Sequence, residues 1–179
     1  MMVCSILLDA RSVGARLPRR LVALKPLRQR HDLHTEVLVA DDTDDPRLLR
    51  LANRHDARIV PMEETPLGDR LNTAFTHSQG EALLFPAGWL TIPASWLETA
   101  VADIEHHRQD AVVLTASSPN TLKRLWQRLR HQTPADTLCI SRIWFERIGG
   151  CDPGLDLEAL SDLIERLRTC PARIRTVVA

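Results

Sequence analysis

The sequence has few of the residues from which metal-bound or disulfide-linked folds are built. None of its four cysteines belongs to a C-x-x-C pair or follows a regular ligand spacing; they are Cys4, Cys139, Cys151 and Cys170. The neighbouring His106 and His107 would point about 100° apart on a helix, which makes them a poor chelating pair. We therefore expect buried, reduced thiols rather than zinc ligands or disulfides.

The chain also lacks an excess of charge and any long apolar run. Lysine plus arginine and aspartate plus glutamate both number 23, so nothing draws the whole molecule toward nucleic acid or an anionic membrane. The apolar run at 3–8 is too short for a signal-peptide core, and no stretch approaches the roughly 20 apolar residues that span a bilayer. We expect a cytoplasmic protein with no nucleic-acid partner, in which any anion site is local.

What the sequence does have is a regular alternation of short apolar runs and helical patterns. Strands are expected at 3–8, 36–40, 57–60, 82–85, 111–114, 137–140 and 174–178. Apolar residues at helical spacing predict helices at 17–27, from 46 onward, at 67–78, after Pro93, and at 122–129, 144–148 and 157–167. This pattern predicts one α/β domain over residues 1–179, a three-layer fold whose mostly parallel sheet carries helices on both faces.

The expected strand ends carry the polar residues from which a ligand site could be built. In parallel sheets of this kind, ligands bind beyond the C-terminal ends of the strands. The first two strands should be neighbours with these ends at the same edge of the sheet. One pocket should therefore be lined by Asp9, Ala10, Arg11, Asp41 and Asp42.

Four segments follow one another in an order that is typical of one family. The first strand and the helix after it read VCSILLDARSVGARLPRRLVAL, and the second strand ends in VADDTDD at 39–45. Two further segments read NTAFTHSQGE at 72–81 and RIWFERIGGCD at 142–152. The last three resemble the patterns V-D-D-G-S-T-D, N-x-G-x-x-x-A-x-G-E and R-x-x-F-x-x-x-G-G-F-D of family 2 glycosyltransferases. The resemblance implies the GT-A fold of nucleotide-diphospho-sugar transferases.

The resemblance also implies roles for single residues. Asp41 would lie beside the nucleotide base and ribose, where a carboxylate can accept hydrogen bonds from N–H and hydroxyl groups. Arg70 and Asn72 would join the substrate site at this edge. Gly149 and Gly150 are interpreted as a structural turn that needs unusual backbone angles.

A second interpretation stays open for part of the acidic run. Asp42, Asp44 and Asp45 fit a ligand site and an acidic turn that caps the next helix about equally well.

The sequence departs from the family where a divalent metal would be held. The family's fourth strand runs into an L-D-A-D-like motif whose carboxylates hold Mg²⁺ or Mn²⁺ against the diphosphate. Here Ala87 and Trp89 stand at the two acidic positions, although Pro93, Trp96 and Leu97 match the flanking pattern. We predict no metal ligands and expect Mg²⁺ or Mn²⁺ only if the motifs are misaligned.

The family's catalytic base is missing too. It belongs to an E-D-x-x-L-x-x-R motif, in which a carboxylate takes the proton of the acceptor hydroxyl. Leu163 and Arg166 match the leucine and the arginine of this motif, but Ala159 and Leu160 stand at the positions of its acidic pair. The nearby Glu158 and Asp162 point in other directions on a helix and are interpreted as solvated surface residues. No catalytic residue is assigned.

Both losses predict a glycosyltransferase-like protein that is degenerate or that works without a metal. In the second case Arg11, Arg16 and Arg70 are candidates to bind a diphosphate. The expected ligand is a nucleotide or a nucleotide sugar. Two alternatives stay open: the segment ARSVGARLP at 10–18 is also similar to the A-R-x-x-S-x-R-L-P of cytidylyltransferases, and the chain could be a non-catalytic interaction module.

Overall fold

A computed structural model describes residues 2–28, 33–86, 91–115 and 136–178. The helix expected at 122–129 and the positions of Ala87 and Trp89 lie outside these ranges. No helix within the described ranges is long and apolar enough to cross a membrane.

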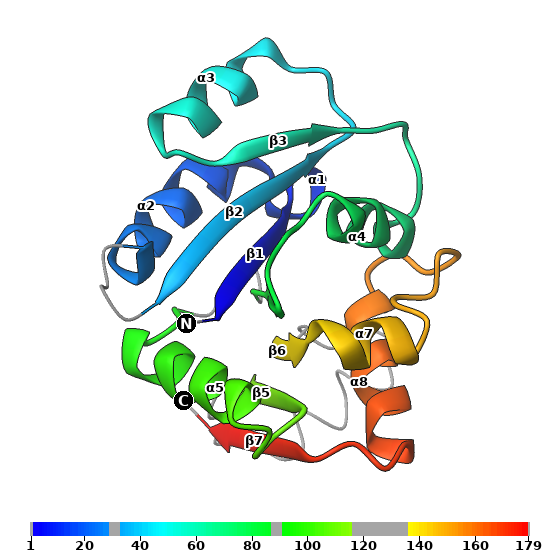
Figure 1. The fold of residues 1–179 in the computed structure, drawn as a ribbon. Helices are drawn as coiled ribbons and strands as arrows, with labels where there is room; N and C mark the ends of the chain where they lie inside the picture. Colours follow the sequence, from blue (N-terminus) through cyan, green and yellow to red (C-terminus); the bar gives the residue numbers. More distant parts are fainter. Residues whose placement is uncertain (1, 29–32, 87–90, 116–135, 179) are drawn as a thin grey trace, which may run out of the picture.

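Seven strands within the described ranges form one sheet through the middle of the molecule (Figure 1). They are β1 (Val3–Asp9), β2 (His34–Asp41), β3 (Arg58–Pro61), β4 (Ala82–Phe85), β5 (Ala111–Thr115), β6 (Thr137–Ser141) and β7 (Ile174–Val178). The spatial order is β3-β2-β1-β4-β6-β5-β7. Only β6 runs antiparallel to its neighbours β4 and β5, so the expectation of a mostly parallel sheet is confirmed.

Helices cover both faces of the sheet, as expected. The described helices are α1 (Ala10–Val13), the 3-10 helix η1 (Gly14–Arg16), α2 (Leu17–Arg28), α3 (Pro46–Arg54), α4 (Leu67–Thr76), α5 (Ala94–Glu105), α7 (Arg142–Arg147) and α8 (Ala159–Thr169). One core cluster joins the sheet to α2, α3 and α5, and the other joins it to α4, α7 and α8. Figure 1 shows these two sets of helices on opposite sides.

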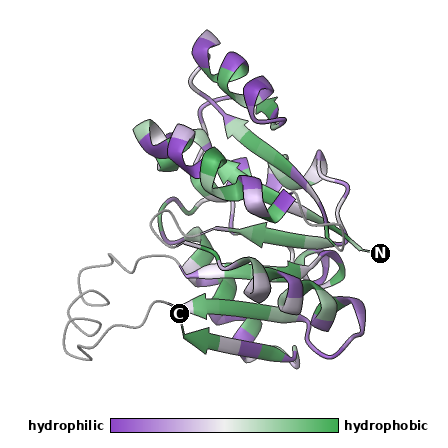
Figure 2. Ribbon diagram, turned by 90° about the vertical axis from the view of Figure 1, so that its left-hand side faces the viewer, coloured by the Kyte–Doolittle hydropathy of each residue, from purple (hydrophilic) through white to green (hydrophobic). Residues whose placement is uncertain are grey.

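The central strands are apolar because both of their faces are buried. In β1, Ile6 and Leu8 belong to one core cluster and Leu7 to the other, as alternating side chains require. Figure 2 shows the strands as mainly hydrophobic between helices with polar outer faces. Ile59 is only partly buried, because β3 is an edge strand.

The four cysteines are free thiols, as the sequence predicted, but one of them is not fully buried. Three are buried, and Cys170 is half-buried. Burial raises the pKa of the Cys151 thiol to about 12, so this group stays protonated and unreactive.

Candidate functional site

The candidate site lies at the C-terminal edge of β1 and β2. The two strands are parallel, and Asp9 stands opposite Ala40, which places Asp9 and Asp41 at the same edge of the sheet. Both carboxylate residues are buried, with exposed fractions of 5% and 6%. Ala10 follows at the start of α1 and is buried as well.

Asp9 is held by two groups on different elements. One of its oxygens accepts a hydrogen bond of 2.7 Å from the Ser12 amide and so caps α1. Both oxygens face the guanidinium of Arg70, which reaches across from α4 with N–O distances of 2.6 and 3.0 Å. This two-pronged ion pair is enclosed, because the Arg70 side chain is only 1% exposed.

The surroundings keep Arg70 charged. Burial by itself would lower the pKa of Arg70, but the hydrogen bond to Asp9 and the charges of Asp9, Asp42 and Asp156 outweigh it, and the pKa is raised. The remaining nitrogen, Nη1, donates to the carbonyl oxygen of Thr65. Arg70 therefore acts as the cation around which the strand-end carboxylates are arranged.

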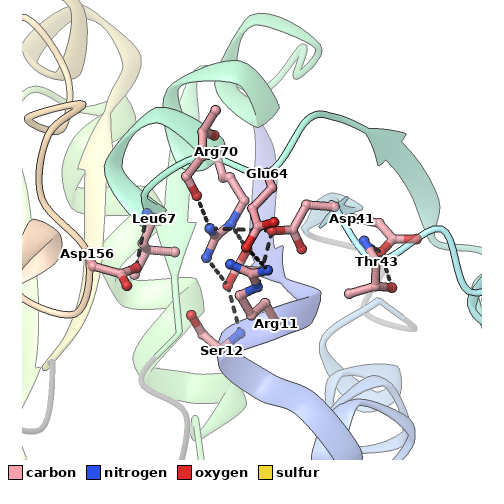
Figure 3. Close-up of polar contacts among 11 residues, drawn as sticks. Arg11, Ser12, Asp41, Thr43, Glu64, Leu67, Arg70 and Asp156 are labelled. Carbon is pink, nitrogen blue, oxygen red and sulfur yellow. Dashed lines mark hydrogen bonds and ion pairs between the residues drawn. The ribbon is translucent and has the colours of Figure 1, made fainter.

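Asp42 has a buried carboxylate for which the described residues provide no hydrogen-bond donor. Its side chain is 0% exposed, and Oδ2 lies 3.2 Å from Nε of Arg11 and 3.6 Å from Nη1 of Arg70. Neither contact has the geometry of a hydrogen bond, and both oxygens lack one. Arg11 turns its outer nitrogen to Glu64 instead, at 2.6 Å. Figure 3 shows Arg11, Glu64 and Arg70 converging at this edge.

The acidic run after β2 forms its own turn. Oδ1 of Asp41 accepts hydrogen bonds from the Thr43 amide at 2.9 Å and the Thr43 hydroxyl at 2.6 Å. Asp44 has a φ of +51°, and Asp45 caps α3 through the Arg47 amide at 2.9 Å. The interpretation of this run as a capping turn is confirmed for Asp45, and the ligand role of Asp41 stays a prediction.

Asn72 lies on α4 and binds the backbone of Cys151, which is 79 residues away in the sequence. Its amide nitrogen donates to the Cys151 carbonyl at 2.8 Å, and its oxygen accepts from the Cys151 amide at 2.9 Å. The preceding Gly149 and Gly150 have φ values of +83° and +72°, so the expected turn with unusual angles is confirmed. A Cβ on Gly150 would lie 2.6 Å from the Asn72 oxygen. Binding of substrate by Asn72 stays a prediction beside this structural role.

The first turn of α8 packs into the core. Ala159 and Leu160 are 0% and 7% exposed and belong to the cluster under α4 and α7. Arg166 donates to the carbonyl oxygens of Ile148 and Gly150 at 3.1 and 2.8 Å. Its Nε donates to Asp162 at 2.7 Å, so Asp162 lies at the surface as interpreted, with a side chain 32% exposed, but it is paired with Arg166.

Glu158, the other acid considered beside α8, is exposed as expected. Arg16, a candidate for the diphosphate, is also exposed, and it makes no ion pair with the described residues.

Two acids at the site were not predicted from the sequence. Asp156, in the loop before α8, accepts a hydrogen bond of 3.2 Å from the Leu67 amide and so covers the start of α4. Glu64 comes from the loop after β3. Asp156 and Leu67 are 89 residues apart, so no local pattern could have signalled this contact.

The described residues do not fit a divalent cation. They hold no group of three or more histidines, cysteines or acids that could share one ion. Three carboxylates at this edge, on Asp9, Asp42 and Glu64, already lie 2.6 to 3.2 Å from Arg11 or Arg70. A metal among them would be repelled by two guanidinium groups.

Comparison with known proteins identifies the family and the fold. The model of glycosyl transferase family 2 matches residues 11–158. The structure of S. aureus TarS 1–349 in complex with UDP-GlcNAc is similar, with a TM-score of 0.71 and 15% identity over 100% of this chain. Glucosyl-3-phosphoglycerate synthase from Mycobacterium tuberculosis, in complex with Mn²⁺, UDP and phosphoglyceric acid, has a TM-score of 0.70 and 16% identity over 99% of this chain. The mannosyltransferase PcManGT from Pyrobaculum calidifontis, in complex with GDP-Man and Mn²⁺, has a TM-score of 0.65 and 20% identity over 99% of this chain.

The chain is shorter than these proteins. It spans 58% of the TarS chain, 68% of the synthase and 56% of the mannosyltransferase. No curated protein matches the sequence.

Proposed function

Because the chain belongs to glycosyl transferase family 2, we propose that it binds a nucleotide or nucleotide sugar at the edge of Asp9, Ala10, Asp41 and Asp42. We propose further that it does not carry out metal-dependent sugar transfer. Similar structures hold UDP-GlcNAc, UDP or GDP-Man, which makes these ligands the first to test.

The Asp42 carboxylate is the observation that carries the binding proposal. Buried polar groups are almost always hydrogen-bonded, and leaving a charged one unbonded is costly. Both oxygens of Asp42 are buried and lack a donor in the described part of the chain. A base N–H or a ribose hydroxyl would supply that donor.

The arginines at this edge favour recognition of the nucleoside over direct binding of a diphosphate. Arg70 is occupied by Asp9, and Arg11 is shared between Asp42 and Glu64. A diphosphate would have to displace a carboxylate from one of them. The two arginines face three carboxylates, so negative charges outnumber positive ones at this edge. This excess favours a ligand group that donates hydrogen bonds.

The loss of transfer chemistry rests on residues that provide no carboxylate. Ala87 and Trp89 stand at the family's metal-binding positions, and Ala159 and Leu160 replace the acidic pair. The side chains of Ala159 and Leu160 are enclosed in the core. Loss of a general base typically costs about 10² to 10⁴ in rate, and loss of the metal removes several kcal/mol of charge stabilisation as well.

Thermal unfolding with a ligand panel tests the proposal. The panel is UDP, GDP, UDP-GlcNAc, GDP-Man and CTP, each with and without Mn²⁺. A ligand at a hundred times its Kd stabilises by about 2.7 kcal/mol, which raises the Tm by roughly 5–10 °C for a chain of this size. We expect such a shift with at least one nucleotide, unchanged by Mn²⁺ and lost in Asp42→Asn. Glu158→Gln, at an exposed position, is the matched control and should respond like the wild type.

Three outcomes would count against the proposal. A shift that requires Mn²⁺, together with Mn²⁺-dependent hydrolysis of a nucleotide sugar, would show that metal chemistry is retained. No shift with any nucleotide would favour the non-catalytic interaction module. Release of pyrophosphate from CTP and a sugar phosphate would instead support a nucleotidyltransferase.

A further inference from the structure

Helices α2 and α3 carry only positive charges. The four cationic residues of α2 are Arg19, Arg20, Lys25 and Arg28, and the three of α3 are Arg47, Arg50 and Arg54. Neither helix contains an aspartate or a glutamate. In a chain whose formal net charge is zero, this is a strong local asymmetry.

The two helices lie next to each other on one face of the sheet. α2 connects β1 to β2 and α3 connects β2 to β3, and these three strands are neighbours in the sheet. Leucines of α2 and Ala52 of α3 enter the same core cluster, so their opposite faces point to solvent. Figure 1 shows both helices on the same side of the molecule.

We define the α2–α3 basic surface as the outward side chains of these helices. Its cations are Arg19, Lys25, Arg47, Arg50 and Arg54, which are all exposed. None of these side chains makes an ion pair or a hydrogen bond with another described residue. Two exposed aliphatic residues lie on the same helices, Val22 at 56% and Leu49 at 57%.

The spacing of these charges is unfavourable for the isolated chain. Arg47 and Arg50 are three residues apart, and Arg50 and Arg54 are four apart, so like charges are neighbours along α3. Repulsion of this kind is relieved when an anionic partner lies across the arginines.

We propose that the α2–α3 basic surface docks an acidic, leucine-containing segment of another protein. Four of its five cations are arginines, whose planar forks match carboxylates in two-pronged pairs. Arginine is enriched in protein interfaces, and Val22 and Leu49 provide apolar contact points between the charges.

Other anionic partners fit this surface less well. Insertion into a membrane interface needs a broad apolar face, but the apolar faces of α2 and α3 are already buried in the core. Binding of single-stranded nucleic acid uses aromatic side chains for base stacking, and neither helix has an aromatic residue.

Fluorescence anisotropy with an acidic probe tests the proposal on the full chain. The probe is a fluorescein-labelled peptide of repeated Glu-Glu-Leu-Glu units, and its control peptide carries Gln in place of every Glu. We expect the acidic peptide to bind, with an affinity that falls as salt is added, and the control peptide to bind poorly.

Charge-reversal variants locate the binding surface. Arg50→Glu should weaken binding by about tenfold, since it removes an attraction and adds a repulsion, and Arg47→Glu combined with it should weaken binding further. Arg168→Glu is the matched control, because Arg168 is an exposed arginine of α8 in the layer on the opposite face. It should bind the peptide as the wild type does, and thermal melts should show that all variants are folded.

Three results would overturn the proposal. The first is equal affinity for the acidic and control peptides. The second is an equal loss of affinity in the Arg50 and Arg168 variants, and the third is the absence of binding to the acidic peptide. Co-sedimentation with vesicles that contain phosphatidylserine, if it depends on Arg50 while the peptide does not bind, would assign the surface to a membrane instead. Because the nucleotide site lies elsewhere, Arg50→Glu should keep the wild-type response to the nucleotide panel.

Discussion

At the scale of single residues, Arg70 organises the candidate site. It is a fully enclosed cation that binds Asp9 directly and lies 3.6 Å from Asp42. Charged groups of this kind are stable in a protein interior only when they are paired and hydrogen-bonded. The same residue therefore maintains the fold and offsets the charge of the buried carboxylates at the edge where the ligand site is proposed.

Replacement of Arg70 should be strongly destabilising. Arg70→Met leaves Asp9 and Asp42 buried without their cation, and we expect the free energy of unfolding to fall by about 3–5 kcal/mol. Urea denaturation measures this change. Arg11→Met is the control, because Arg11 is 46% exposed and its solvent-screened ion pairs should contribute little to stability. Similar losses in both variants would contradict the central role of Arg70.

At the scale of elements, the connections between strands are held by side chains from distant parts of the chain. The α7–α8 turn is fixed to α4 by Asn72 and to α8 by Arg166. Edge strand β7 is joined to β5 in the same way, since Arg173 donates to both oxygens of Asp110 at 2.9 and 3.0 Å. Such contacts determine how the ends of neighbouring elements meet.

The Asp110–Arg173 contact should make the stability of the β5–β7 junction depend on pH. The hydrogen bond from Arg173 lowers the pKa of Asp110. A carboxylate with a lowered pKa stabilises the fold above its unfolded pKa of about 3.9, and this contribution is lost as the pH falls through the folded pKa. We expect the difference in unfolding free energy between the wild type and Asp110→Asn to be constant above about pH 5 and to shrink below about pH 4.

Urea denaturation at a series of pH values measures this difference. Glu165→Gln, at an exposed position of α8, controls for the removal of one acidic residue. A difference that stays constant down to pH 2 would show that the ion pair does not stabilise the junction.

At the scale of the whole molecule, the sequence predicted the architecture because each central strand is a continuous apolar run. The runs at 3–8 and 82–85 match β1 and β4 within one residue. The direction of β6 was not predicted, since apolar pattern carries no information on strand direction. The last helix begins at Ala159 rather than at 157, and Leu157 is 67% exposed, so its place in the inward face was wrongly assigned.

The candidate site could be predicted only in part. Parallel neighbouring strands bring Asp9 and Asp41 to one edge, and this followed from topology. The pairing of Asp9 with Arg70, 61 residues away, depends on how α4 packs against the sheet. The capping of α4 by Asp156 depends on packing as well, and Gly68 permits it because a Cβ there would lie 1.9 Å from the Asp152 carbonyl oxygen.

Restoring the family's acidic pair should not restore the family's chemistry. In Ala159→Glu/Leu160→Asp, two carboxylates enter positions that are 0% and 7% exposed and are enclosed by the core beneath α4 and α7. Burial of an unpaired charge is strongly unfavourable, so we expect a loss of several kcal/mol of stability, a markedly lower Tm and no gain of hydrolysis of UDP-GlcNAc or GDP-Man with Mn²⁺.

The control for this variant is Glu165→Asp, which alters an acid on the exposed side of the same helix and should change neither property. A stable double variant with new Mn²⁺-dependent turnover would show that the first turn of α8 can face the candidate site, and that the predicted absence of a metal site is wrong. We expect the opposite result, because Ala159 and Leu160 fill the core at the positions where the family has its acidic pair. The two side chains that stand in place of the acids are thereby part of what holds α8 against the sheet.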